Sequence, residues 1–180
     1  PYLLTLGPHG HYWFLLREEK DGAAGHADDT LPAVEISTGW QSLLRDKKKR
    51  ILEAEVLPRY LQQTRWFGGK SKHINRVEII ESVPVCKTRD YGFMVLVQTH
   101  YQTGPSETYL LPLAFVPDSA ESSLVQQHPA AVIARLSAGG EQGVLADALY
   151  TEAFRSELLK NWIKRKRLKG ESGTRWTLPL

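Results

Sequence analysis

The stretch that decides the fold is Phe93–Tyr101, which reads FMVLVQTHY. Every second side chain along it, from the first residue to the last, is apolar or aromatic except Thr99. Successive side chains of a strand point to opposite faces, so this alternation predicts a strand with one buried face. The surrounding segments are therefore interpreted as parts of a sheet. The residues of this face are Phe93, Val95, Val97, Thr99 and Tyr101.

Four further segments have the same extended character and are separated by turn residues. They span residues 74–85, 108–116, 132–136 and 144–149. The connections between them are short and leave no room for crossover helices, which favours an antiparallel meander. We therefore expect a curved antiparallel sheet.

A helix is expected on the N-terminal side of this sheet. Apolar residues recur there at helical spacing, and the basic run 45–50 should face water. Pro58 should end or kink this helix, because proline has no backbone N–H to donate. The apolar positions are Leu43, Leu44, Ile51, Leu52 and Val56.

A second helix is expected after the sheet. Thr151 should cap it, Glu152 lies in its first turn, and Gly170 should end it. Its apolar stripe is Phe154, Leu158, Leu159, Trp162 and Ile163, and its C-terminal turns carry Lys164, Arg165, Lys166, Arg167 and Lys169. Helices packed on an antiparallel sheet make an α+β domain.

Composition narrows the class of protein. The chain has 180 residues, of which 42% are hydrophobic and 24% charged, as in ordinary globular proteins. A single cysteine, Cys86, excludes an intramolecular disulfide and a Cys-rich zinc site, and favours the cytoplasm. No apolar run reaches the roughly 20 residues of a membrane helix, so we expect no membrane partner.

The N-terminal part differs in character from the rest. Residues 2–16 are apolar and aromatic and are broken by glycine and proline, which predicts a hairpin-like appendage of two short strands. Residues 18–33 are small and charged and are interpreted as a linker. The chain begins with Pro1 and has a single methionine, Met94, so we expect it to be a piece of a longer polypeptide.

Two short motifs invite a catalytic interpretation. Residues 68–71 contain the G-K-S core of a phosphate-binding loop, but a helix precedes them and a strand follows, and Thr64 stands where the motif needs its first glycine. Residues 90–92, Asp-Tyr-Gly, resemble the metal-binding triplet of kinases without the partners it needs. We interpret the first as a glycine turn and the second as a hairpin turn.

No other residue type forms a catalytic or metal-binding pattern. Two histidines around Gly10 lack a third ligand, and no nucleophile motif is present. We therefore assign no catalytic, cofactor-binding or metal-binding residue to this chain, and interpret Cys86 as structural. The histidines are His9, His11, His26, His73, His100 and His128.

Two basic clusters, 45–50 and 160–169, could neutralise phosphates. Such clusters also occur on solvated helix faces, and the helix dipole favours cations at a C-terminus. A net charge of only +3 argues against a nucleic-acid partner. A basic nucleic-acid-binding domain stays an alternative.

Beyond these patterns, two stretches resemble known families. Residues 6–15, LGPHGHYWFL, resemble the closing strands of the C-terminal β-domain of trehalose synthase, in the α-amylase-like glycoside hydrolase superfamily. Residues 57–70, LPRYLQQTRWFGGK, resemble the start of maltokinase. Residues 109–113 and 143–149 resemble later strands of the same N-terminal cap region. This order is similar to that of bifunctional trehalose synthase/maltokinase fusion proteins.

The resemblance implies a division of the chain. Residues 1–17 would be the synthase tail, 18–33 the linker and 34–150 the maltokinase N-terminal cap domain. Residues 151–180 would be a basic amphipathic helix and the start of the kinase nucleotide lobe. The implied cap is cystatin-like, with a curved antiparallel sheet against a helix.

The resemblance also implies a function for the parent polypeptide. It would interconvert maltose and trehalose, and phosphorylate maltose with ATP and Mg²⁺ to maltose 1-phosphate for α-glucan synthesis. The groups that position and neutralise a transferred phosphoryl have no counterpart in this chain, which is expected to be inactive alone. Its partners would be the kinase lobes and the synthase. A free-standing cystatin-like protein-binding module is a further alternative.

Overall fold

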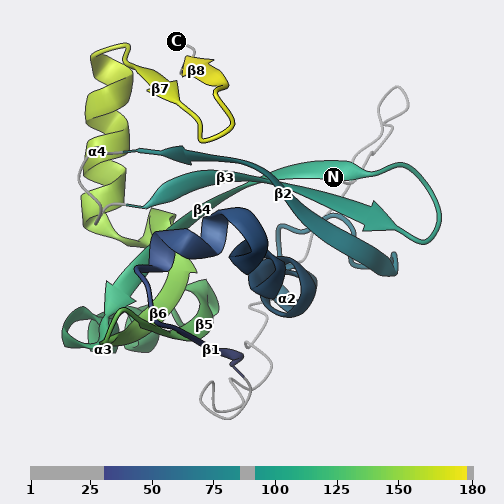
Figure 1. The fold of residues 1–180 in the computed structure, drawn as a ribbon, viewed down its shortest axis with the longest axis horizontal. Coiled ribbons are helices and arrows are strands. Elements are labelled where there is room, and N and C mark those ends of the chain that lie inside the picture. The colour runs from purple at the N-terminus through teal and green to yellow at the C-terminus, as the bar shows by residue number, and fades with distance from the viewer. Residues whose placement is uncertain (1–30, 86–91, 178–180) are drawn as a thin grey trace, which may run out of the picture.

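The computed structural model describes residues 31–85 and 92–177, which form a six-stranded, strongly curled sheet with helices on both of its faces (Figure 1). The predicted α+β class with a curved sheet is confirmed. The predicted appendage and most of the linker lie outside the described residues. The strands, in their order across the sheet, are β1 (Ala33–Ile36), β5 (Val132–Ala138), β6 (Glu141–Asp147), β4 (Glu107–Pro117), β3 (Phe93–Tyr101) and β2 (Ile74–Pro84).

Strand β3 has the predicted bounds and the predicted alternation. Its odd-numbered side chains are buried and its even-numbered ones are half-buried. Both neighbours run antiparallel to it: β2 pairs Pro84 with Phe93, and β4 pairs Leu113 with the same residue. The sheet is therefore built outward from the stretch with the strongest sequence pattern.

The expected meander is wrong beyond β4. After β4, a ten-residue helix, α3 (Asp118–Gln127), and the turn η4 (Pro129–Ala131) carry the chain past the position next to β4, which is left open for a later strand. Strand β5 then returns through Gly139 and Gly140, whose φ angles of 60° and 89° suit a two-residue hairpin turn. Strand β6 thus comes to lie beside β4, with β5 outside it.

The expectation of a wholly antiparallel sheet is also wrong, because the edge strand β1 runs parallel to β5. Ala33 lies opposite Arg135, and Ile36 opposite Ala138. At four residues β1 is too short to show a decisive alternation in the sequence. Its parallel direction follows from the long helical segment after it, which carries the chain from β1 at one edge of the sheet to β2 at the other.

That helical segment is less regular than the single predicted helix. Leu57 donates its N–H to the Leu52 carbonyl, five residues back, in a π-type turn directly before Pro58. Pro58 then stands in the first turn of the next α-helix, where its missing N–H is tolerated, so the chain does not end its helix there. The pieces are η1 (Trp40–Leu44), η2 (Asp46–Lys48), α1 (Lys49–Ile51), η3 (Leu52–Val56) and α2 (Leu57–Gln63).

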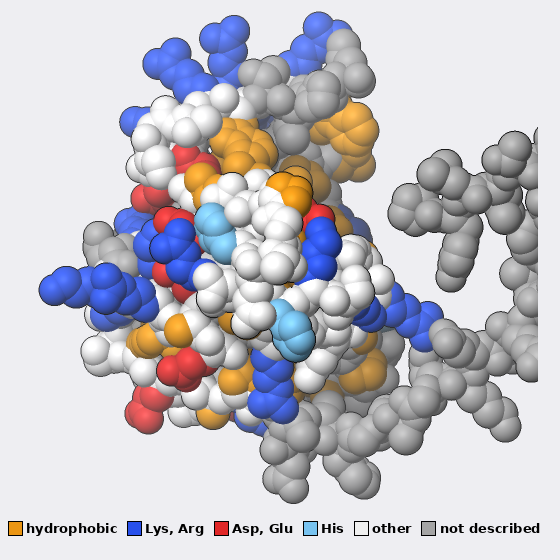
Figure 2. Space-filling model, turned by 90° about the vertical axis from the view of Figure 1, so that its right-hand side faces the viewer, with side chains coloured by type: hydrophobic (Ala, Val, Ile, Leu, Met, Phe, Trp, Pro, Cys, Tyr) orange, Lys and Arg blue, Asp and Glu red, His pale blue; other side chains and the backbone are white. Residues whose placement is uncertain are grey.

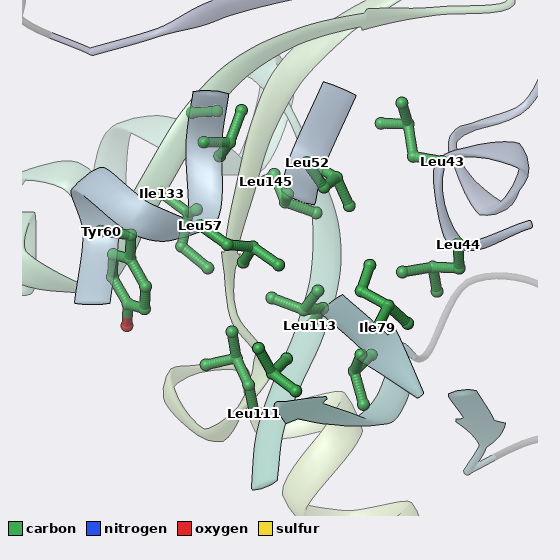
Figure 3. Packing of buried hydrophobic residues seen from close by; sticks show 14 of the residues in the cluster. Leu43, Leu44, Leu52, Leu57, Tyr60, Ile79, Leu111, Leu113, Ile133 and Leu145 are labelled. Carbon is green, nitrogen blue, oxygen red and sulfur yellow. The ribbon is translucent and has the colours of Figure 1, made fainter. Parts of the chain in front are cut away.

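The main core lies between this segment and the sheet. Figure 3 shows Leu52 and Leu57 of the segment directed toward Leu113 of β4 and Leu145 of β6. All four side chains are at most 1% exposed. Each fully buried leucine contributes roughly 1.5–3 kcal/mol to folding, so this contact is the main source of stability for the domain.

The opposite face of the sheet carries α3 and a later helix, α4 (Glu152–Ile163), which follows the turn η5 (Ala148–Tyr150). Phe154 of α4 is fully buried against Ala114, the neighbour of Leu113 on β4. Adjacent residues of a strand point to opposite faces, so α4 and α2 lie on different sides of the sheet. No helix in the described ranges is long and apolar enough to span a membrane.

The two ends of α4 differ from expectation. Thr151 is at the N-cap position, but its hydroxyl donates to the Ala148 carbonyl at 2.8 Å instead of capping the helix. The helix ends at Ile163 and not at Gly170, because Arg165 adopts the left-handed conformation with φ of 48°. The following residues form a hairpin of β7 (Arg167–Lys169) and β8 (Arg175–Thr177).

Candidate functional site

The most distinctive motif of the sequence forms a tight turn between α2 and β2. At its start, the Thr64 hydroxyl donates to the Leu61 carbonyl at 2.9 Å and closes the helix. At its centre, a Cβ atom on Gly69 would lie 2.3 Å from the Tyr101 hydroxyl oxygen and 2.6 Å from Phe67 Cζ. Only glycine fits at this position, because such distances are shorter than any van der Waals contact.

A cluster of four polar side chains holds the end of this turn against the sheet. The Lys72 ammonium lies 2.6 Å from Glu107 Oε1, and the Tyr101 hydroxyl donates to Glu107 Oε2 at 2.7 Å. The Tyr109 hydroxyl donates to the same oxygen. Lys72 also lies 4.6 Å from the centroid of the Tyr101 ring, in a cation–π contact. We call Lys72, Tyr101, Glu107 and Tyr109 the clamp.

Aromatic rings extend the clamp along the motif. The Tyr109 ring lies 5.1 Å from the Phe67 ring and 5.9 Å from the Trp66 ring, between centroids. Trp66 in turn contacts Tyr60 of α2 at 6.5 Å. Such ring pairs each contribute about 0.5–1.5 kcal/mol beyond burial. The R-W-F-G-G-K turn is thus fixed to β4 by side chains from its own domain.

The protonation states of the clamp suit a structural role. Hydrogen bonds from Lys72, Tyr109 and Tyr101 lower the pKa of Glu107 to about 2. Burial, together with the Glu107 carboxylate, raises the pKa of both tyrosines. At neutral pH the carboxylate is therefore charged and the phenols neutral, and none of these three groups is poised to exchange a proton.

Of the two short motifs singled out in the sequence, the structure describes the first in full and the second only at Gly92. Gly68 to Ser71 lie after α2 and before β2, whereas a phosphate-binding loop follows a strand and opens a helix. The glycine-turn interpretation is confirmed. Gly92 has a φ of 92°, as expected of a turn glycine, but its partners Asp90 and Tyr91 lie outside the described residues.

The histidines are scattered over the described part of the chain. The His100 ring accepts from or donates to the Ser106 hydroxyl at 2.9 Å and lies 3.6 Å from the Glu78 carboxylate. The His128 ring lies against Tyr150. Across residues 31–85 and 92–177, no three metal-ligating side chains come together. His9, His11, His26 and Cys86 lie outside these ranges.

A second polar site, not foreseen from the sequence, joins the β7–β8 hairpin to β2. Glu81 is only 4% exposed and accepts hydrogen bonds at 3.0 Å from the backbone N–H groups of Ser82 and Ser172. Burial alone would raise the pKa of Glu81, but hydrogen bonds from the hairpin, first from the Ser172 N–H, outweigh it and lower that pKa. Gly170 leaves room for the carboxylate, since a Cβ there would lie 2.5 Å from Glu81 Cδ.

The basic cluster 45–50 surrounds an open hollow of about 750 Å³. Much of its charge is used within the domain. Arg45 pairs with Glu171 of the hairpin turn, Lys49 lies 3.4 Å from Glu53, and Lys48 donates to the Thr38 hydroxyl at 2.8 Å. Through Arg45 the cluster therefore helps to hold the hairpin.

The predicted apolar stripe of α4 is only partly buried. Phe154 is fully buried, and Asn161, one of the few buried polar residues, donates to the Val85 carbonyl. Leu159, Trp162 and Ile163 are 52%, 48% and 73% exposed. A helix turns by about 100° per residue, which places these three on a second apolar side of α4, away from Phe154.

Comparison with known proteins agrees with this arrangement. The family model of the maltokinase N-terminal cap domain matches residues 60–150, half of the chain. The matched region runs from α2 to η5 and includes the glycine turn and the whole clamp. A search of curated proteins gave no match. The resemblance stated from residues 57–70 is thereby confirmed, and the chain belongs to the maltokinase N-terminal cap domain family.

Proposed function

We propose that this chain is the non-catalytic N-terminal cap region of a maltokinase that is fused to a trehalose synthase. The parent polypeptide would interconvert maltose and trehalose in the cytoplasm and phosphorylate maltose with ATP to maltose 1-phosphate, for α-glucan synthesis. Residues 1–17 would be the end of the synthase, and residues 151–180 would lead into the nucleotide lobe of the kinase.

One observation carries the non-catalytic part of this proposal. The motif that is most typical of the family, R-W-F-G-G-K, is used for contacts within the domain. Phe67 and Gly69 are buried against β3 and β4, and Lys72, two residues after the motif, is paired with Glu107. The buried residues of the motif thus support the fold, which favours a structural role over a catalytic one.

The described residues do not fit ATP and Mg²⁺. Their only G-K-S sequence lies between a helix and a strand, in the reverse of the order that a phosphate-binding loop needs. The metal-ligating side chains described are dispersed over the domain. We propose that the remainder of the kinase binds nucleotide and magnesium, and that the cap braces the nucleotide lobe through the contact between Glu81 and the β7–β8 hairpin.

The test is a coupled assay of ADP release with maltose and ATP. We expect no maltose-dependent turnover from the 180-residue chain and robust turnover from the parent polypeptide. The parent with Glu81→Ala should fold but lose activity, because the hairpin would lose the carboxylate that accepts its Ser172 N–H and would be held to β2 less firmly. Turnover by the chain alone would refute the proposal, and unchanged activity of the Glu81→Ala parent would refute the bracing role.

A further inference from the structure

Positive charge is concentrated at one end of this molecule. Residues 160–175 contain seven Lys and Arg residues and one acid, Glu171, although the whole chain has a net charge of only +3. The rest of the chain therefore carries more acids than bases. Figure 2 shows Lys and Arg side chains at the end of the molecule where Figure 1 places β7 and β8, with hydrophobic side chains exposed beside them.

The helix dipole accounts for only a small part of this charge, chiefly Lys160 in the last turn of α4. The dipole favours cations in the last turn of a helix, but α4 ends at Ile163. Lys169 of β7 lies directly opposite Arg175 of β8, and both are exposed. Like charges in facing positions destabilise a hairpin, and in the part of the chain that the structure describes neither residue forms an ion pair.

The backbone conformation of Arg165 also indicates that this basic end of the molecule has a function. It has a φ of 48° directly after the helix, where the Arg165 N–H donates to the Trp162 carbonyl at 2.9 Å. The Lys166 N–H donates to the Asn161 carbonyl, which completes a turn that usually has glycine at its left-handed position. A strained residue at such a position is a reason to look for a function of its side chain.

The exposed apolar side of α4 indicates what kind of partner would bind beside the β7–β8 hairpin. On α4, Leu159 lies one helical turn from both Trp162 and Ile163, and all three side chains are exposed. Exposed apolar patches with a charged rim are typical of protein interfaces, where Trp and Arg are enriched. Phosphates attract the cations but give no role to Leu159 and Ile163, which disfavours a nucleic acid.

We propose that these residues form a docking surface for another protein surface, one with an apolar centre ringed by Asp and Glu. The partner's apolar side chains would cover the exposed side of α4, and its carboxylates would pair with the facing cations of the hairpin. The proposal is independent of whether the parent polypeptide phosphorylates maltose. The α4–hairpin surface consists of Leu159, Trp162, Ile163, Arg165, Lys169 and Arg175.

The test titrates the full 180-residue chain with a designed peptide. The probe is a 16-residue amphipathic helix with leucines along one side and glutamates elsewhere. We expect saturable binding that weakens with salt, and NMR amide shifts confined to residues 159–177. A peptide with lysines in place of the glutamates, and a peptide with serines in place of the leucines, should each bind at least tenfold more weakly.

Single substitutions test which residues of the chain bind the acidic peptide. Ile163→Ser and Lys169→Glu should each weaken the acidic peptide at least fivefold. The matched controls are Leu110→Ser, which removes an exposed leucine of β4, and Lys47→Glu, which reverses a charge in the other basic cluster. Both controls should bind the peptide like the unmodified chain.

Three results would overturn the proposal. The first is peptide binding that Ile163→Ser leaves unchanged. The second is equal binding of the serine-substituted peptide, which would show attraction to charge alone. The third is a single-stranded 20-mer DNA or an anionic lipid vesicle that binds at the same residues more tightly than the peptide does. Thermal unfolding of each variant confirms that it is folded.

Discussion

The helices α2 and α4 both carry apolar side chains, yet they use them differently. Leu57 and Leu61 of α2 are fully buried in the main core. On α4 only Phe154 is equally buried, while Leu159 and Ile163 face water. The first helix is used entirely by its own domain, and the second keeps apolar surface available for a partner.

The hydrogen-bonded carboxylates of Glu107 and Glu81 differ in the same way as the two helices. Glu107 of the clamp joins residues within the region that the family model matches. Glu81 joins that region to the β7–β8 hairpin, which lies beyond it. One side of the domain thus maintains its fold, and the other side connects it to residues that lie beyond the matched region.

The largest expected effect is a loss of stability when a core residue of α2 is truncated. Leu57→Ala should destabilise the chain by about 2–5 kcal/mol, because it leaves a cavity between α2 and the sheet. Ile163→Ala on α4 should change the free energy of unfolding by less than about 0.5 kcal/mol. Urea unfolding followed by circular dichroism measures both. Similar values for the two variants would show that the helices do not differ as described.

The glycine turn should respond strongly to a single methyl group. Gly69→Ala should cost about 1–3 kcal/mol, because the new Cβ would overlap the Tyr101 hydroxyl and the Phe67 ring. Adding Tyr101→Phe removes one of the two overlaps and should recover part of the loss. Gly140→Ala, where a Cβ meets no atom within 4 Å but φ is 89°, separates backbone strain from steric overlap.

A smaller effect of opposite sign is expected at the end of α4. Arg165→Gly should stabilise the chain by about 1 kcal/mol, because glycine adopts a positive φ without strain. Lys164→Gly is the matched control. Its φ is −80°, so glycine there removes no strain and should destabilise. Thermal unfolding of the two variants gives the comparison.

The smallest effect is the pH dependence of the clamp. The pKa of Glu107 is lowered to about 2, so its carboxylate stabilises the fold above its ordinary pKa of about 4.5. That contribution is lost as the pH falls from about 4.5 toward 2. The difference in urea midpoint between the unmodified chain and Glu107→Gln should therefore be largest near pH 7 and shrink below pH 4.5. A difference that stays constant down to pH 2.5 would contradict the clamp.

Much of this fold could be predicted from local pattern. Strand β3 was predictable because Phe93, Val95 and Val97 alternate, and the R-W-F-G-G-K turn because it carries a family resemblance. The parallel edge strand β1 was not, because four residues give too little alternation and its pairing with β5 depends on contacts far apart in the sequence. The crossing of α3 was missed because residues 118–127 contain few apolar side chains.

The site was less predictable for a physical reason. A helical pattern shows which side chains are apolar, but only the packing shows that Phe154 is buried and Ile163 is not. Glu81 has no local signal, since its partner Ser172 lies 91 positions away. The tyrosines of the clamp had a weak signal, because Tyr101 and Tyr109 flank the β3–β4 turn.

The most direct test of the difference between the two sides combines stability and binding in one variant. Arg165→Gly should raise the melting temperature and at the same time weaken binding of the acidic amphipathic peptide several-fold. An increase in stability together with weaker binding is expected only if Arg165 contributes to binding a partner and not to the stability of the fold. A variant that is more stable and binds the peptide as before, or one that is less stable, would contradict the account.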